Sequence, residues 1–282
     1  MSVQIIVDSA ADFEESAVQA HSLTVIPLKT IFPDGEYIDG VTLSREEFYR
    51  KLVDCKEIPQ TSQIPPHEFE TVFHRVREAG DTAVVILLSG KLSGTLQSAR
   101  MAAKGLEDII FIVDSENVTV GERILAERGI SLRDSGLSAR EIAAILDKEK
   151  KNICLIAALD TLEYLKKGGR ISKTVAFAGG LLSIKPVIGI KDGEVVLLGK
   201  ARGSKQSNNM LMQMIRENGG VDFSRPIRLG YSGLDDTLLC QYVEDSRELI
   251  EGNLDQLESS MVGSTIGTHV GPGAIAVAFF HK

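Results

Sequence analysis

The sequence predicts an α/β fold in two domains, and three observations support that prediction. The chain has 282 residues, which is longer than a typical single domain and long enough to bury two cores. Its first half alternates short apolar runs with amphipathic stretches, as parallel strands and crossover helices do. Its second half changes to helical stretches and hairpin signals, which are typical of an α+β sandwich. We expect domains at 1–156 and 157–282.

The strand candidates of the first half are continuous aliphatic runs rather than alternating ones. This is the pattern of strands whose sheet is covered by helices on both faces. It predicts a Rossmann-like, doubly wound parallel sheet in the first domain. The candidates are 3–7, 83–88, 109–113 and 153–159.

Helix signals lie between and after these runs. Ser44 with Glu47, and Ser138 with Glu141, have the spacing of a capping box, in which each side chain satisfies a backbone N–H at a helix start. Further helices are expected behind Pro65, near 210–215 and over 235–251, and further strands at 227–231 and 274–280.

Two Asp-Gly pairs predict β-hairpins, because these dipeptides favour the tight turns that join antiparallel strands. Asp34-Gly35 places a hairpin near 24–42, which we interpret as a small β arm inserted into the first domain. Asp192-Gly193 places a second hairpin in the later domain.

Composition and charge exclude several classes of function. The net charge of −8 and a pI near 5.3 give nucleic-acid phosphates nothing to attract. The start of the chain does not resemble a signal peptide, and the most apolar stretch, 175–190, is interrupted and too short to span a bilayer. Cys55, Cys154 and Cys240 fit reduced thiols better than a disulfide framework or a metal site. We therefore expect a cytoplasmic protein.

The loop in LLSGKLSGTLQSA, between a predicted strand and a predicted helix, is a candidate anion site. Unpaired N–H groups at a helix start solvate negative charge. Gly90 and Gly94 would let the backbone approach a ligand, while Ser89, Ser93 and Thr95 would supply hydroxyl donors. The alternative is that Ser93 or Thr95 only caps the helix.

A second hydroxyl loop, QTSQIPP, contains Thr61 and Ser62 and is stiffened by the prolines that follow. Its alternative interpretation is an ordinary helix cap before Pro65. Asp8, in DSAAD, would repel an anion, so we assign it to loop architecture. His269 lies in a glycine-rich turn, and an isolated histidine is more often structural than catalytic.

Two other classes of function are alternatives to a carrier protein that binds an anion. A hydrolase or acyltransferase would pair Ser93 with His269, although the sequence has no G-x-S-x-G elbow. A sensor of small anions or nucleotides would use the helix-start loop alone, although neither phosphate-binding glycine motif is present.

Six motifs together resemble the bacterial DegV family of fatty-acid-binding proteins over essentially the whole chain. The one departure is Ala10, where that family usually has threonine. In order, the motifs are DSAAD, TSQIPP, SGKLSGTLQSA, LEYLKKGGRIS, IKPVIG and GTHVGPGA.

The resemblance implies a non-catalytic carrier that holds a palmitate- or oleate-like fatty acid in a tunnel between the domains. It also implies that Thr61 and Ser93 bond the carboxylate, with Arg170 and His269 near that end. A separate fatty acid kinase would make the acyl phosphate there. No cofactor is expected, and transient membrane contact would allow lipid exchange. From the loops and the resemblance together, the candidate contacts are Thr61, Ser62, Ser93, Gly94, Thr95, Arg170 and His269.

The residues that line such a tunnel are harder to assign, because an apolar side chain is more often simple core. Candidates for the lining are Phe177, Leu181, Leu182, Ile184, Met210 and Met214.

Overall fold

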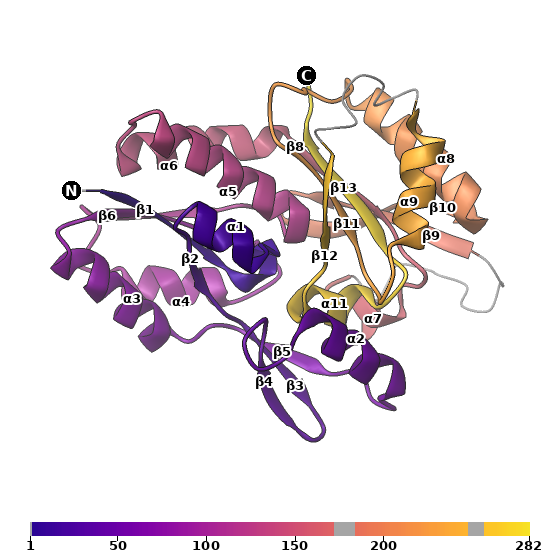
Figure 1. Ribbon diagram of the computed structural model, residues 1–282, viewed down its shortest axis with the longest axis horizontal. Helices are drawn as coiled ribbons and strands as arrows, with labels where there is room; N and C mark the ends of the chain where they lie inside the picture. The colour runs from indigo at the N-terminus through magenta and orange to yellow at the C-terminus, as the bar shows by residue number, and fades with distance from the viewer. Residues whose placement is uncertain (1, 172–183, 248–256) are drawn as a thin grey trace.

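The computed structural model of the protein describes residues 2–171, 184–247 and 257–282. Figure 1 shows two sheets side by side, with the chain passing from one to the other and a small arm below them. The N-terminal α/β part and the C-terminal part with a mixed sheet confirm the predicted fold class.

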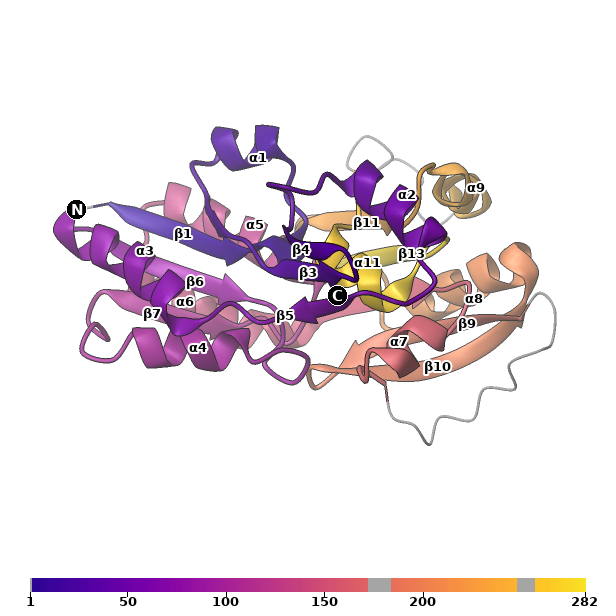
Figure 2. The ribbon, with the colours of Figure 1, turned by 90° about the horizontal axis from the view of Figure 1, so that it is seen from below.

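The first sheet is four-stranded and parallel throughout, in the order β2-β1-β6-β7. Helices α3 and α4 pack on one face, and α5 and α6 pack on the other (Figure 2). Both faces are therefore buried, which explains the continuous apolar runs. The elements are β1 (Val3–Asp8), η1 (Ser9–Ala11), α1 (Glu15–Ala20), β2 (Thr24–Ile26), α3 (Pro66–Glu78), β6 (Thr82–Leu87), α4 (Thr95–Ala102), β7 (Ile110–Asp114), α5 (Thr119–Asp134) and α6 (Ala139–Glu149).

The second sheet has six strands in the order β10-β9-β8-β13-β11-β12, all antiparallel except the β11–β12 pair. Helices α8 and α9 cover one face, and α5 packs against the other. The elements are η2 (Lys150–Asn152), β8 (Ile153–Ala158), α7 (Glu163–Lys167), β9 (Ile184–Lys191), β10 (Glu194–Arg202), α8 (Gly203–Glu217), β11 (Ile227–Tyr231), α9 (Thr237–Asp245), β12 (Glu258–Met261), α11 (Ser264–Val270) and β13 (Ile275–Phe280).

The predicted strand at 153–159 exists, but its assignment to the first sheet is wrong. It forms β8 of the second sheet, between β9 and β13. Leu155 and Ala157 face the core shared with α5, while Ile156 and Ala158 face α8. Since both sheets are buried on both faces, a continuous apolar run does not distinguish them.

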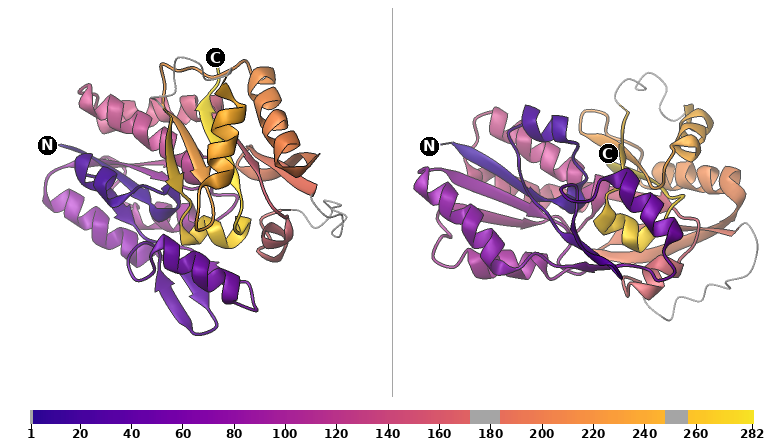
Figure 3. Two further views of the ribbon diagram at one scale, coloured as in Figure 1. Left: turned by 45° about the vertical axis from the view of Figure 1, so that its right-hand side comes forward. Right: turned by 60° about the horizontal axis from the view of Figure 1, so that its bottom comes forward.

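The predicted arm is a three-stranded antiparallel sheet. Its hairpin turns at Asp34-Gly35, as expected, and a third strand is added from the segment after α2. The arm packs against α11, so it reaches the C-terminal part of the chain (Figure 3). The elements are β3 (Lys29–Phe32), β4 (Gly35–Ile38), α2 (Arg45–Asp54) and β5 (Gln60–Ser62).

Local signals located most other elements correctly. Both capping boxes are present, at the starts of α2 and α6, and the Asp192-Gly193 hairpin joins β9 to β10. The helix expected over 235–251 is observed as α9, and the part of that range from 248 lies outside the described residues. Within the described ranges, every helix is too short or too polar to cross a bilayer.

Candidate functional site: a cavity between the two sheets

An apolar cavity lies between the two sheets, with about 860 Å³ of space outside protein atoms, including the part that opens to solvent. Its wall is mostly leucine, isoleucine and valine side chains from both parts of the chain. A concave, largely apolar site with a few converging polar groups is the usual form of a small-molecule site. The lining residues are Leu28, Thr61, Ser62, Gln63, Leu88, Leu92, Ser93, Val118, Thr119, Leu155, Ala157, Leu159, Leu165, Arg170, Ile188, Ile190, Val195, Val262, Thr265, Ile266, His269, Val270, Ala274, Ile275 and Ala276.

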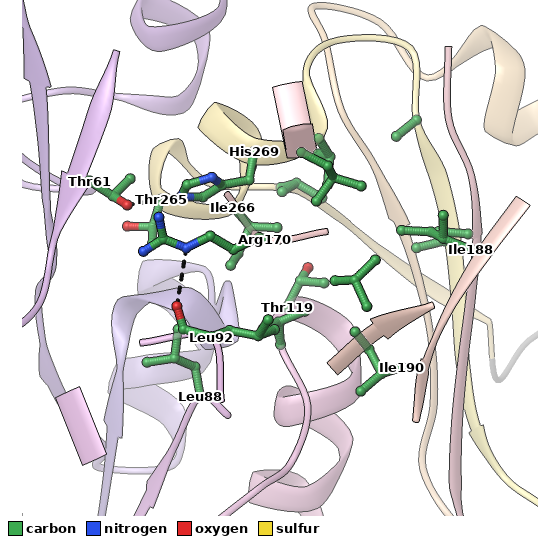
Figure 4. A pocket seen from close by; sticks show the side chains of 18 of the residues that line it. Thr61, Leu88, Leu92, Thr119, Arg170, Ile188, Ile190, Thr265, Ile266 and His269 are labelled. Atoms are coloured by element: carbon green, nitrogen blue, oxygen red, sulfur yellow. Dashed lines mark hydrogen bonds between the residues drawn. The ribbon is translucent and has the colours of Figure 1, made fainter. Parts of the chain in front are cut away.

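Polar groups gather at one end of this cavity. Figure 4 shows Thr61, Arg170 and His269 close together on one side, whereas Ile188 and Ile190 lie on the opposite side. The cavity therefore has a polar end and an apolar end, which matches the two ends of an amphiphile.

Thr61 and His269 are joined directly, although they are 208 positions apart in the chain. Thr61 lies on β5, which the arm strand β3 holds in place, and His269 lies in the last turn of α11. Thr61 Oγ1 and His269 Nε2 are 2.9 Å apart. Burial, and then the positive charge of Arg170, lowers the pKa of His269 to about 4, so the ring is neutral at pH 7.

The other ring nitrogen of His269 is buried without a hydrogen-bond partner. Gly168, which follows α7, packs against this Nδ1, and a Cβ atom at that position would overlap it. An unpaired buried nitrogen costs free energy, so Nδ1 is a group that a bound ligand or water would satisfy.

Arg170 brings a positive charge to the polar end. Its Nε donates to Leu92 O at 3.2 Å, and its Nη1 donates to Gly168 O at 2.6 Å. Burial lowers the pKa of its guanidinium, but an arginine stays charged at neutral pH. Within the part of the chain that the structure describes, no carboxylate pairs with it. The site is thus complementary to an anion.

The two hydroxyl loops meet at the same end. Ser93 lines the cavity, and its Oγ lies 3.0 Å from Thr95 Oγ1. Thr95 is fully buried behind it and accepts the backbone N–H of Ile64 at 3.3 Å. Thr95 therefore ties the Ser93 loop to the Thr61 loop instead of lining the cavity.

The structure separates the other loop candidates. Ser62 lines the cavity, but Gly94 packs against Gln63, where a Cβ would overlap the amide. The alternative capping role is observed in part for Ser93, whose Oγ accepts the backbone N–H of Thr95, the first residue of α4, at 3.3 Å. The capping role considered for Thr61 or Ser62 is wrong, because Pro65 is the N-cap of α3 and no side chain caps that helix.

The serine-nucleophile alternative lacks its hydrogen bonds. His269 bonds Thr61, and Ser93 bonds Thr95. No side chain of the described ranges orients His269 through Nδ1. A nucleophile activated by a base that a third group orients is therefore not assembled in this arrangement.

A buried aspartate fixes the start of α11, the helix that carries His269. Asp39, in the arm, accepts four hydrogen bonds: from the backbone N–H and hydroxyl of Ser264 at 3.0 and 2.8 Å, from Thr265 Oγ1 at 2.8 Å and from Ser9 Oγ at 3.0 Å. These bonds join the arm, the end of β1 and α11 into one unit.

Two further aspartates act in the same region. Asp12 accepts the N–H of Gly263 at 2.8 Å and the hydroxyl of Thr119 at 2.6 Å. Asp8 accepts the N–H groups of Ala10 and Leu88, which confirms its assignment to loop architecture. Burial raises the pKa of each carboxyl to about 7, despite these hydrogen bonds.

Glu122, on α5, is the exception among the buried carboxyl groups. It is fully buried, and neither side-chain oxygen has a hydrogen-bond partner. Burial, followed by the charges of Asp8, Asp12 and Asp114, raises the pKa of Glu122 well above its usual value. Burial therefore favours the uncharged form of Glu122.

Several lining residues were not identified from the sequence. The sequence does not indicate Thr119 and Thr265, because their hydroxyls bond aspartates that are distant in the chain. It does not indicate Leu28 either, because that residue precedes a strand of the arm. Ile188 and Ile190 lie in the apolar stretch that the sequence did highlight.

Most of the proposed tunnel lining is not confirmed. Phe177, Leu181 and Leu182 lie outside the described residues. Met210 and Met214 are wrong as lining residues, because they belong to α8, which packs on the far face of the second sheet. Ile184 begins β9 but does not line the cavity.

Residues 2–282 match the family model described as an uncharacterised protein of the DegV family. A DegV domain-containing protein of Caldanaerobacter subterraneus subsp. tengcongensis is 33% identical, with 99% of each chain covered.

Two solved structures have the same fold over the full length. A DegV family protein from Thermus thermophilus, described by its fatty acid binding, has a TM-score of 0.89 at 28% identity and covers 100% of both chains. A stearic acid-binding protein from Eubacterium ventriosum has a TM-score of 0.87 at 28% identity, covering 100% of this chain and 99% of its own.

Proposed function

Because this chain belongs to the DegV family, we propose that it binds one long-chain fatty acid in the cavity between its sheets. The observation that supports this most directly is the polarity of the cavity, which is apolar along its wall and has at one end a guanidinium that no carboxylate of the described residues pairs with. The fatty-acid and stearic-acid binding described for the two similar structures supports the same ligand class.

In this proposal the tail supplies most of the affinity. Burying ~14 methylene groups at ~0.8 kcal/mol each gives roughly 11 kcal/mol before the costs of association are subtracted. The isoleucine, leucine and valine side chains of both sheets would make these contacts.

The head group would lie between Thr61 and Ser93. Both hydroxyls border the cavity, Arg170 supplies the positive charge, and His269 Nδ1 supplies a further unpaired nitrogen. Ser62 is close enough along the wall to contribute, while Gly94 and Thr95 would act by holding the loop. A carboxylate leaves water at little cost only when such donors replace its hydration.

We further propose a carrier without chemistry of its own, which works in the cytoplasm and presents the carboxylate to a separate fatty acid kinase. The absence of an oriented base near Ser93 within the described ranges supports a carrier over a hydrolase. A fluorophosphonate probe separates these classes, because a carrier should not be labelled and a Ser93-dependent label would show a hydrolase.

The direct test is to denature protein purified without added lipid and identify the extracted ligand by mass spectrometry. We expect a fatty acid in near-stoichiometric amount. The variant T61A/S93A should remain folded and bind palmitate at least tenfold more weakly, since two hydrogen bonds to a charged group are lost. Protein that yields no fatty acid and takes up neither palmitate nor oleate would refute the proposal.

A further inference from the structure

A groove on the surface lies between the end of α2 and the start of α9, and we call it the α2–α9 groove (Figure 2). It contains about 650 Å³ outside protein atoms, including the part that opens to solvent. Buried residues such as Tyr49 and Leu239 form its floor. Ala274 lines both this groove and the cavity between the sheets, so the groove lies directly behind one wall of that cavity.

Three large apolar side chains that line the groove are exposed to solvent. Val53, near the end of α2, is 66% exposed, Leu234, in the turn before α9, is 50% exposed, and Leu238, in the first turn of α9, is 36% exposed. Single exposed apolar residues are ordinary, but a group of them around a concave surface is typical of an interaction site. The groove therefore offers apolar surface that a partner could bury.

The charges beside the groove are negative. Of the described residues that line it, Asp235 is the only charged one, and Asp236 next to it is also exposed. Burial, and then the negative charges of Asp236 and Glu46, raises the pKa of the Tyr231 phenol, which lines the groove. The two aspartates and the glutamate thus form an acidic rim on the apolar groove.

The nearby positive charge of Arg45 does not open toward this rim. Its Nη2 donates to the carbonyl oxygen of Phe13 at 2.9 Å, and its Nη1 lies 3.8 Å from a carboxylate oxygen of Glu14. The guanidinium is therefore held by α1 and the segment before it, and the rim stays open to a cation from outside the molecule.

These charges distinguish between possible occupants of the groove. An anionic membrane surface would be repelled by the acidic rim. A second copy of the chain, bound through a twofold contact at the groove, would bring two acidic rims together. A positively charged partner gains from the same rim, because complementary charges favour encounter and set the orientation of docking.

We propose that the α2–α9 groove is a docking site for a segment of another protein that carries apolar side chains flanked by lysine or arginine. The apolar side chains would cover Val53, Leu234 and Leu238, and the cations would pair with the acidic rim. This proposal goes beyond fatty acid binding and does not depend on it.

The first test compares two labelled peptides with the same leucine face, KLLKKLLKKLLK and ELLEELLEELLE. Their leucines lie on one side of a helix, and only the sign of the flanking charges differs. Fluorescence anisotropy with the full-length protein should show that the lysine peptide binds at least about tenfold more tightly at low salt. Equal affinities for the two peptides would overturn the proposal.

Two variants place the binding on the groove. L234S/L238S should weaken binding of the lysine peptide by about tenfold or more, because it removes apolar surface that the peptide would bury. D235N/D236N should weaken it by about fivefold or more at low salt, since each exposed ion pair contributes up to about fivefold. Asparagine keeps an acceptor for the N–H of Thr237, so the start of α9 is preserved. Unchanged affinity in both variants would overturn the proposal.

Matched controls separate the groove from the general negative charge of the protein. E70Q/E78Q removes two exposed carboxylates of α3, and V41S/M101S removes two exposed apolar side chains that lie outside the groove. Each control should change peptide affinity by less than about twofold, and weakening equal to that of the groove variants would overturn the proposal.

The other two occupants are tested directly with the same variants. Binding of wild type, but not of L234S/L238S, to phosphatidylglycerol vesicles would assign the groove to a membrane and overturn the proposal. Sedimentation that shows a wild-type dimer and an L234S/L238S monomer would assign it to a second copy and overturn the proposal as well. We expect no vesicle binding that depends on these leucines, and the same sedimentation for both proteins.

Discussion

The two ends of α11 differ in whether their buried polar groups have hydrogen-bond partners. At the start of the helix, the polar groups of Gly263, Ser264 and Thr265 are bonded to Asp12 and Asp39. At its end, His269 leaves one nitrogen unpaired beside an arginine that no described carboxylate neutralises. We interpret a network in which every polar group has a hydrogen-bond partner within the protein as structural. A network in which a buried polar group lacks a partner can bind a polar ligand.

The strongest test of the satisfied end is D39A. The substitution leaves the four donors around the carboxylate without an acceptor in a buried place, so we expect a loss of about 3–5 kcal/mol in the free energy of unfolding. Urea denaturation measures it. The exposed arm residue Asp34 provides the control, since D34A removes only its surface contacts with Lys51 and Tyr37 and should leave stability nearly unchanged. A D39A protein as stable as D34A would show that the network is not structural.

The strongest test of the open end is R170Q. The neutral side chain keeps a donor at the position of Nε for Leu92 O, but it loses the charge and the Nη1 bond to Gly168 O. Fatty acid affinity should fall by about 10- to 100-fold, or roughly 1.4–2.8 kcal/mol, with little change in stability. Displacement of a fluorescent fatty acid gives the affinity. R170K, which keeps the charge, should recover part of the loss, and R100Q, at an exposed position of α4, should have no effect. Unchanged affinity in R170Q would contradict the assignment of the polar end.

Glu122 sharpens the comparison, because it is unpaired like His269 but does not border the cavity. Its folded pKa lies above the unfolded value, so the folded state holds a proton that the unfolded state releases. The stability from this group is therefore complete below the unfolded pKa, near 4.5, and is lost at about 1.4 kcal/mol per pH unit as pH rises toward the folded pKa.

The variant E122Q should remove this loss. Its stability relative to wild type should increase as pH rises above the ordinary pKa of glutamate, measured by urea denaturation, although Asp8 and Asp12 leave a slope below pH 7 in both proteins. The control E70Q, at an exposed position of α3, should give a stability curve parallel to that of wild type. Parallel curves for E122Q and wild type would mean that Glu122 is charged and paired.

Local signals in the sequence predicted the local structure well. The capping boxes at Ser44 and Ser138 and the turns at Asp34-Gly35 and Asp192-Gly193 need only neighbours within a few residues, so the sequence contains the whole interaction. The sheet that accepts strand β8 could not be predicted in the same way, because that choice depends on which distant strands border it.

The site was predictable only in part for the same reason. Resemblance to a family brought Thr61, Ser93, Arg170 and His269 to one place, but no pattern in the chain shows that Thr61 bonds His269 or that Gly168 packs against that ring. The sequence predicted Thr95 as a ligand contact, but its hydroxyl binds the neighbouring loop and does not line the cavity. In the sequence, a hydroxyl residue at the end of a loop looks the same in both cases.

The finest test of the comparison uses two threonines of the same cavity wall. The hydroxyl of Thr265 donates a hydrogen bond to Asp39, at the start of α11. The hydroxyl of Thr61 is hydrogen-bonded to His269, at the end of α11. T265V should therefore lower stability by about 1 kcal/mol and leave palmitate affinity unchanged, because one of four hydrogen bonds to Asp39 is lost. T61V should weaken palmitate binding by about three- to fivefold with little effect on stability. Valine keeps the shape of threonine, so each variant is the packing control for the other. If both variants changed stability equally, or palmitate affinity equally, the two ends of α11 would not differ in the way we infer.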